Sequence, residues 1–273
     1  MYRLGCCVPG YLVSKEVSEA SHSSYDILKT GHEKIIENGF DYAEATVGLI
    51  MGLTDEELIL ASEIRNIEVC NSFIPATLPI VKGNDSDLQQ YVKQSMSRMQ
   101  KLGVDTVVFG SGGARRIPDG MDRKEGMRWI EDFLTMCNEY AIKHNITVAV
   151  EPLNQKECNV LTSVAEGAEL VEKLQLGHIG LLADSYHMAL EKEPLSVLSD
   201  TAHLLVHVHI SEADRTYPGK YNGADLPEFA DQLKAAGYKG RITAECRFTD
   251  FVTESAIVAT YLRKITSVIK PFL

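Results

Sequence analysis

Four side chains able to bind a metal ion each follow a short apolar segment. They are Glu151, Asp184, His209 and Glu245, after the segments ITVAV, IGLLA, LLVHV and RITA. Burying an ionised carboxylate without a partner costs on the order of several kcal/mol, so such groups gathered in one place need a shared compensating charge. Three carboxylates and one neutral imidazole suit a hard or borderline divalent ion, and no thiolate set competes with them. We therefore expect one divalent metal ion, with Mn²⁺ favoured and Mg²⁺ or Co²⁺ as alternatives. Taken singly, Glu151, Asp184 or Glu245 is better explained as a polar strand end satisfied by a helix N-terminus, and it is the set of four on consecutive strands that favours the metal.

The apolar segments that precede these four residues fit parallel β-strands buried on both faces, whose carboxyl ends open onto a site. Strand-like segments recur along the whole chain, at 3–8, 40–47, 67–73, 104–110, 146–152, 178–184, 204–210 and 241–246. Helix-like segments fall between them, at 26–38, 54–65, 85–102, 124–144, 162–175, 194–201, 225–236 and 250–268. Thr54 followed by Glu57 is the pattern of a capping box, and Thr162 suits a helix N-terminus.

Eight regular alternations of strand and helix, without a linker rich in proline, glycine or serine, predict an α/β fold. We expect residues 1–273 to form a single (β/α)8 TIM barrel domain; an open, doubly wound sheet is the alternative. In a barrel, the ends of the fifth to eighth strands bring the four candidate ligands to the catalytic face. The loops after the third, fourth, fifth and seventh strands are the longest, so we expect them to form the walls around a substrate.

Composition restricts the partners that this protein can bind. The formal net charge of -11 argues against nucleic acid as a partner, because nucleic-acid-binding proteins carry a basic face or stripe. The N-terminal segment lacks the features of a signal peptide, and no apolar run is long enough to span a bilayer. The six cysteines include no CxxC pair, so no disulfide framework is expected. We expect a cytoplasmic homo-oligomer, a dimer or a tetramer, that binds a small molecule and no membrane.

Longer motifs connect the candidate ligands with a known family. They are Glu151-Pro152-Leu153-Asn154 with Glu157, Asp184-Ser185-Tyr186-His187-Met188, His207-Val208-His209-Ile210-Ser211-Glu212 with Arg215 and Pro218-Gly219, and Gly237-Tyr238-Lys239-Gly240 before Glu245. In these motifs the chain resembles the sugar isomerase/epimerase family of xylose-isomerase-like barrels. The resemblance spans the barrel and is strongest from the fifth strand onward. Among the subfamilies it is most similar to ketose 3-epimerases of the tagatose and psicose type.

The resemblance implies a role for each matched residue. Glu151, Asp184, His209 and Glu245 would hold the metal, and the two glutamates would also move the substrate proton. Glu157, His187 and Arg215 would bind the hydroxyl groups or the carbonyl end of a sugar. The chemistry is consistent with this reading, because a proton next to a ketone is very weakly acidic and its removal requires a stabilised enediolate. A metal that chelates the carbonyl and hydroxyl oxygens stabilises that enediolate as a Lewis acid.

Each substrate-binding assignment has a plainer alternative. His187 could be a structural histidine in a loop, Arg215 a solvated surface charge, and Glu157 a residue that orients a metal ligand. His207 lies on the same strand face as His209 but one layer deeper, which favours a packed, hydrogen-bonded core residue.

Two segments depart from the epimerase pattern. The segment 110–116, with three glycines before Arg115 and Arg116, predicts either an anion pocket or a tight turn with two surface arginines. The end of the first strand, at Cys6-Cys7-Val8-Pro9, lacks the aromatic pair associated with free-ketose epimerases.

The leading functional hypothesis is a metal-dependent isomerase that epimerises a ketose or keto-sugar, favouring carbon 3. The alternatives that share its chemistry are a lyase of the inosose dehydratase type, which would expel a β-hydroxyl, and a hydroxypyruvate isomerase. A DNA-repair AP endonuclease shares the barrel but needs further metal ligands and a basic groove. A non-catalytic sugar-binding barrel is disfavoured because both candidate proton-transfer glutamates are present.

Overall fold

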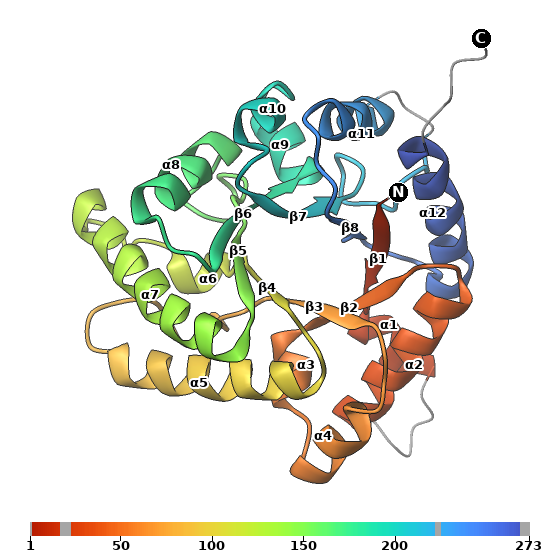
Figure 1. The fold of residues 1–273 in the computed structure, drawn as a ribbon, viewed down its shortest axis with the longest axis horizontal. Coiled ribbons are helices and arrows are strands. Elements are labelled where there is room, and N and C mark those ends of the chain that lie inside the picture. Colours follow the sequence, from red (N-terminus) through yellow and green to blue (C-terminus); the bar gives the residue numbers. More distant parts are fainter. Residues whose placement is uncertain (1, 17–22, 222–224, 268–273) are drawn as a thin grey trace.

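The fold is built on a closed ring of eight parallel strands, as predicted (Figure 1). A computed structural model of the chain describes residues 2–16, 23–221 and 225–267. The strands are β1 (Arg3–Cys7), β2 (Tyr42–Thr46), β3 (Ile67–Asn71), β4 (Thr106–Phe109), β5 (Thr147–Val150), β6 (Ile179–Asp184), β7 (Leu205–Ile210) and β8 (Arg241–Ala244). Each strand pairs with the next in sequence, and β1 closes the ring on β8, with Leu4 opposite Ile242 and Cys6 opposite Ala244. The structure is therefore a (β/α)8 TIM barrel, and the open-sheet alternative is excluded.

Helices surround the ring on its outside (Figure 1). The eight predicted ones are α2 (Ser24–Glu37), α4 (Asp55–Ala61), α5 (Asp85–Lys101), α7 (Arg123–His144), α8 (Val164–Leu174), α10 (Val197–Thr201), α11 (Asp225–Ala235) and α12 (Phe251–Thr266). The capping box of Thr54 and Glu57 is present at the start of α4. The N-cap of α8 is Ser163 rather than Thr162, because the Ser163 hydroxyl accepts the backbone N–H of Glu166. Residue 268, the end of the last predicted helix, lies outside the described residues.

Four short helices were not predicted. They are α1 (Gly10–Glu16), α3 (Val47–Met51), α6 (Gly112–Arg115) and α9 (Ser185–Glu191), and each follows a strand at the carboxyl end of the barrel with at most two residues between. Segments of four to seven residues are too short to repeat an amphipathic pattern, so the sequence gives no periodic signal for them. As a result, the candidate site residues Asp184 and His187 lie at the start of α9 rather than in an open loop.

Side chains alternate along each strand between the barrel interior and the surrounding helices. Inward-facing residues fill the ring in a small cluster of their own: Tyr42, Val69, Val108, Ala149 and Leu182. Outward-facing neighbours such as Ala43, Cys70, Val107, Val148 and Leu181 belong to the larger clusters that the helices cover. Two residues further on, the inward positions are Glu44 in β2, Glu151 directly after β5 and Asp184 at the end of β6. Strand alternation thus places acidic groups directly above an apolar plug.

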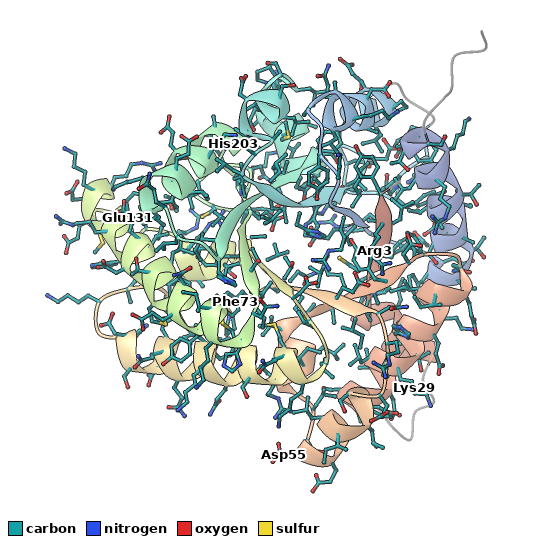
Figure 2. The ribbon with its side chains drawn as sticks, in the orientation of Figure 1. Arg3, Lys29, Asp55, Phe73, Glu131 and His203 are labelled. Atoms are coloured by element: carbon teal, nitrogen blue, oxygen red, sulfur yellow. The ribbon has the colours of Figure 1, made fainter. Side chains whose placement is uncertain are left out.

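Most of the core lies between the ring and its helices. Phe73, which follows β3, is fully buried and its ring packs 6.4 Å from that of Phe133 on α7, whereas Lys29 and Asp55 project outward (Figure 2). Among the described residues, no helix combines the length and the apolar character needed to cross a membrane.

The interior of the ring leaves no room for an added methyl group at Gly5. A Cβ built there would overlap the ring of Tyr42, its register partner on β2. We predict that Gly5→Ala destabilises the protein by about 1–3 kcal/mol, the usual cost of overpacking a core. Gly177→Ala is the matched control, because a Cβ at that exposed glycine meets nothing within 4 Å and its φ is not positive. Urea unfolding of both variants measures the difference, and equal midpoints would contradict the prediction.

Candidate metal centre

The four predicted ligands meet at the mouth of the barrel. One ligand atom from each of Glu151, Asp184, His209 and Glu245 lies within 4.8 Å of the others. Glu151 directly follows β5, Asp184 ends β6, His209 lies in β7 and Glu245 directly follows β8. The structure therefore brings together side chains that are up to 94 residues apart in the sequence, counted from 151 to 245. Oxygen atoms and one imidazole nitrogen at this spacing fit a single divalent ion of the kind expected.

His209 stands at the centre of this cluster and is fully buried. Its Nδ1 lies 3.0 Å from a carboxylate oxygen of Glu151 and 2.9 Å from one of Glu245. Burial alone would lower the pKa of His209, but the surrounding carboxylates of Glu44, Glu245 and Glu151 outweigh it and raise that pKa well above its usual value. A cation is strongly favoured at Nδ1, and either a proton or a metal ion can supply it.

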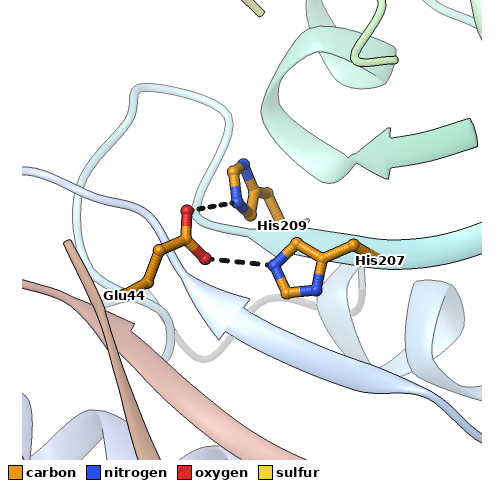
Figure 3. Close-up of side chains that lie close together, drawn as sticks. All are labelled: Glu44, His207 and His209. Carbon is orange, nitrogen blue, oxygen red and sulfur yellow. Dashed lines mark hydrogen bonds and ion pairs between the residues drawn. The ribbon is translucent and has the colours of Figure 1, made fainter. Parts of the chain in front are cut away.

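Glu44 was not predicted from the sequence to belong to this site. It lies on the side of His209 opposite Glu151 and Glu245. This glutamate lies within β2, is fully buried, and accepts hydrogen bonds from Nε2 of both His207 and His209, each at 3.0 Å (Figure 3). The sequence does contain a signal for Glu44, because this acidic residue interrupts the strand segment FDYAEATV. Each of the four candidate ligands likewise stands at the end of an apolar strand segment. The prediction that His207 is a hydrogen-bonded core residue is confirmed.

Arg215 is no solvated surface charge. Its guanidinium donates to Asp184 Oδ2 at 2.6 Å and also to Glu245, and it lies 4.6 Å above the ring of Tyr186. Burial opposes the charged form of Glu245, but Arg215 and His209 outweigh it and lower the Glu245 pKa to about 2. The pKa of Glu151, in contrast, is raised by burial and by the nearby charge of Glu245. The two glutamates thus differ in proton affinity, as an acid–base pair requires.

His187 lies in helix α9 rather than in a loop, and it is buried. Its Nδ1 accepts hydrogen bonds from the backbone N–H of Asn154 at 3.0 Å and from the Asn154 side-chain amide at 2.8 Å. An imidazole that accepts at Nδ1 carries its proton on Nε2, which here lies 3.7 Å from Asp184. His187 therefore offers an N–H donor at the edge of the cluster.

Glu157 is exposed at the rim of the site. Its carboxylate accepts from the Asn154 amide at 2.9 Å and from the Tyr186 hydroxyl at 3.3 Å. Asn154 thus links Glu157 with His187. The motif that contains Asn154 was recognised in the sequence, but no role was predicted for this residue.

Arg115 fits neither interpretation of the segment 110–116. It is buried, and its guanidinium donates to the backbone carbonyl groups of Phe109 at 2.8 Å and Glu151 at 2.7 Å. It ties together the ends of β4 and β5 and is not part of the candidate ligand set. Arg116 is exposed, as expected for a surface arginine.

A cavity of about 450 Å³ opens above the cluster. Its walls come from the loops after β3, β4, β5 and β7, as predicted, and from residues after β2 and β6. Polar groups in this lining include Thr46, Asn71, Ser72, Ser111, Glu157 and His187. Ser72, Ser111 and Arg215 also have positive φ angles, of 54°, 38° and 65°. Non-glycine residues in this conformation cost on the order of 1–3 kcal/mol each and concentrate at functional sites.

The fold is shared with other proteins of known sequence and structure. A family model described as xylose isomerase-like TIM barrel matches residues 33–264. An L-ribulose 3-epimerase structure superposes with a TM-score of 0.82 at 19% identity, covering 97% of this chain and 95% of that one. A protein whose structure holds a zinc atom superposes with a TM-score of 0.76 at 19% identity, covering 97% of this chain and 98% of its own.

Sequence relatives with curated descriptions are sugar epimerases. The 3-dehydro-D-guloside 4-epimerase of Escherichia coli (strain K12) is 30% identical over 121 residues, which is 44% of this chain and 46% of that protein. The probable ketose 3-epimerase of Synechocystis is 31% identical over 126 residues, 46% of this chain and 43% of that protein. The chain thus matches less than half of the length of these two relatives. The D-psicose 3-epimerase of Agrobacterium fabrum is 25% identical over 236 residues, 78% of this chain and 77% of that protein.

Asp184 tests the metal site directly, because it is a buried carboxylate of the candidate ligand set. We predict that Asp184→Ala, purified without chelator, retains far less than one equivalent of divalent metal, whereas the unaltered protein retains close to one. Glu212→Gln is the matched control, since Glu212 is also a buried carboxylate on this face but accepts the backbone N–H of Gly219 at 2.9 Å, outside the ligand set. Elemental analysis measures the metal content, and equal content in the Asp184 variant and the unaltered protein would refute the site.

Proposed function

Since the chain belongs to the xylose isomerase-like TIM barrel family, we propose that it is a divalent-metal-dependent epimerase that inverts carbon 3 of a ketose. The observation that carries the proposal is the pair Glu151 and Glu245. Both carboxylates contact Nδ1 of His209, yet their pKa values are moved in opposite directions. The epimerase descriptions of the curated relatives support the same reaction class.

Epimerisation next to a ketone needs one group to remove a proton and another to return one on the opposite face. Glu151 and Glu245 extend from β5 and β8, which are separated in the ring by β6 and β7. They therefore approach the mouth of the barrel from different directions. Glu245, held ionised by Arg215, suits the base that removes the proton. Glu151, with its raised pKa, suits the acid that returns it.

A divalent ion held by Glu151, Asp184, His209 and Glu245 would supply Lewis-acid stabilisation of the negative charge that develops on the sugar oxygens. Among divalent ions, we propose Mn²⁺ for this donor set, with Mg²⁺ or Co²⁺ as alternatives.

We assign substrate binding to His187, Glu157 and Arg215. The Nε2–H of His187 can donate to a sugar oxygen, while Glu157 can accept from a hydroxyl group at the cavity rim. Arg215 holds Asp184 and Glu245 in place and lines the same cavity. Complementary donors and acceptors of this kind fix the orientation of a polyhydroxy substrate.

The charge of the cavity favours a neutral sugar. Among the described residues, Arg215 is the one lysine or arginine in the lining, and two carboxylates already neutralise it. Glu157 adds a further negative charge at the rim of the same cavity. A terminal phosphate at this rim would be desolvated without a free lysine or arginine beside it.

Three other activities could use the same barrel. A lyase would expel a β-hydroxyl from the same enediolate, and a hydroxypyruvate isomerase would act on a shorter substrate. A 4-epimerase of a keto-glycoside would act one carbon further along, as the Escherichia coli relative does by its description. Mass spectrometry separates the lyase from the others because loss of water changes the product mass, and NMR of the product identifies the inverted carbon.

Proton transfer through the two glutamates predicts exchange with solvent. Turnover of a ketose in D₂O should place deuterium at the carbon that inverts. Glu245→Gln, assayed at saturating metal, should lower kcat by about 10²–10⁴-fold, the usual contribution of a general base. Product NMR locates the label. Unlabelled product, or a variant that keeps its turnover, would contradict this mechanism.

The cavity also predicts discrimination by charge. A free ketose should be used with a kcat/KM at least about tenfold higher than that of its terminal phosphate, because 1.4 kcal/mol of unfavourable desolvation already gives that factor. Arg116→Ala should leave both values unchanged, since this exposed arginine does not line the cavity. Steady-state kinetics on the two substrates provides the comparison, and a preference for the phosphate would overturn the neutral-substrate proposal.

A further inference from the structure

Glu44 is an acidic residue in the barrel interior that the proposed reaction does not use. It is fully buried and accepts hydrogen bonds from His209 Nε2 at 3.0 Å and from His207 Nε2 at 3.0 Å (Figure 3). It accepts a third from the Asn71 amide at 2.9 Å. It lies on the side of His209 away from Glu151 and Glu245, which contact the other ring nitrogen.

An imidazole ring with one proton carries it on one nitrogen and a lone pair on the other. An ionised carboxylate only accepts hydrogen bonds, so the contact with Glu44 keeps a proton on Nε2 of His209. The lone pair then belongs to Nδ1, which faces Glu151 and Glu245. This is the ring nitrogen that must be free of a proton to bind a metal ion.

We propose that Glu44 is a positioning residue that fixes the tautomer and ring orientation of His209, and thereby sets the affinity of the site for its divalent ion. The inference rests on the proposed metal site but adds to it a residue that does not touch the ion. A carboxylate behind a metal-binding histidine raises the basicity of the ligand, and removing such a partner costs about 10–100-fold in metal affinity.

The carboxylate of Glu44 is itself held in place. Asn71 donates to Oε1, the same oxygen that accepts from His209, and His207 donates to Oε2. His207 Nε2 also lies 3.1 Å from the Thr243 hydroxyl, which lies 2.7 Å from that of Tyr42. Residues from β2, β3, β7 and β8 therefore fix both oxygens of Glu44 and aim one of them at His209.

The same three residues could alternatively bind a second ion. One ligand atom from each of Glu44, His207 and His209 lies within 4.8 Å of the others. Both carboxylate oxygens, however, are already at hydrogen-bond distance from a ring nitrogen, and all three side chains are fully buried. Hydrogen bonding accounts for the arrangement, and metal stoichiometry distinguishes the two cases.

Two substitutions of Glu44 test the proposal. Glu44→Leu removes both acceptor oxygens, and it should weaken Mn²⁺ binding by about 10–100-fold. Glu44→Gln should recover most of that loss, because Asn71 orients the amide oxygen towards His209. Ser95→Ala is the matched control: it removes a fully buried hydroxyl on α5, outside the ring, that donates to the Val92 carbonyl, and its Mn²⁺ affinity should stay within about twofold of the unaltered protein.

Free Mn²⁺, measured by electron paramagnetic resonance at one pH, gives the affinity and stoichiometry without an assay of turnover. Unchanged Mn²⁺ affinity in Glu44→Leu would overturn the proposal. Equal weakening of Mn²⁺ binding by Glu44→Leu and Glu44→Gln would also overturn it, because the charge of Glu44, and not its hydrogen bond to His209, would then account for the effect. Two ions per chain would assign Glu44 to a second site instead. If the unaltered protein binds one ion and Glu44→Leu matches it, only this inference fails and the proposed function stands.

A measurement on the unaltered protein covers the case in which Glu44→Leu does not fold. With ¹⁵N-labelled histidine and Cd²⁺ or Zn²⁺ as a diamagnetic probe, NMR should find the proton of His209 on Nε2 and the metal on Nδ1. Coordination through Nε2 would overturn the proposal.

Discussion

The barrel mouth depends on one constraint, which is that several buried carboxylates surround a single imidazole. Glu44 contacts one nitrogen of His209, while Glu151 and Glu245 contact the other. Arg215 adds a positive charge from the outer side. Such a concentration of negative charge is tolerable in a low-dielectric interior only if cations balance it. The same imbalance favours a divalent ion and separates the proton affinities of the two glutamates, so the proposed metal binding and the proposed acid–base chemistry would have a common electrostatic origin.

Most of the fold could be predicted from the sequence because strand and helix signals alternate regularly along the chain. All eight predicted strands are present, since runs of valine, isoleucine and alanine bounded by polar residues are distinctive. Helix boundaries were less accurate, as with α4, which ends at Ala61 instead of residue 65. The short helices α1, α3, α6 and α9 follow from the geometry at the strand ends, and local sequence carries no periodic pattern that reveals them.

The site was predictable where a residue marks the end of a strand and less so where tertiary contacts define its role. The four candidate ligands follow apolar runs, and their side chains do meet. Arg115 was misread because its partners are backbone carbonyl groups, which leave no mark in the sequence. Glu44 was overlooked because it lies within a strand, although strand alternation places it on the same face as Tyr42. The charge of Arg215 was visible, but not its two carboxylate partners.

Closure of the ring through β1 and β8 has a consequence for the order in which the protein folds. These strands pair across more than 200 residues, for example Leu4 with Ile242, and such distant contacts form slowly because a long loop must close first. Glu44 and Glu245 lie on opposite sides of that seam, on β2 and just after β8. The complete set of side chains around His209 exists only once the ring has closed. In small zinc domains the metal organises an otherwise unfolded chain. Here the ion would be captured late, by a barrel that has already assembled, and its uptake would report the end of folding.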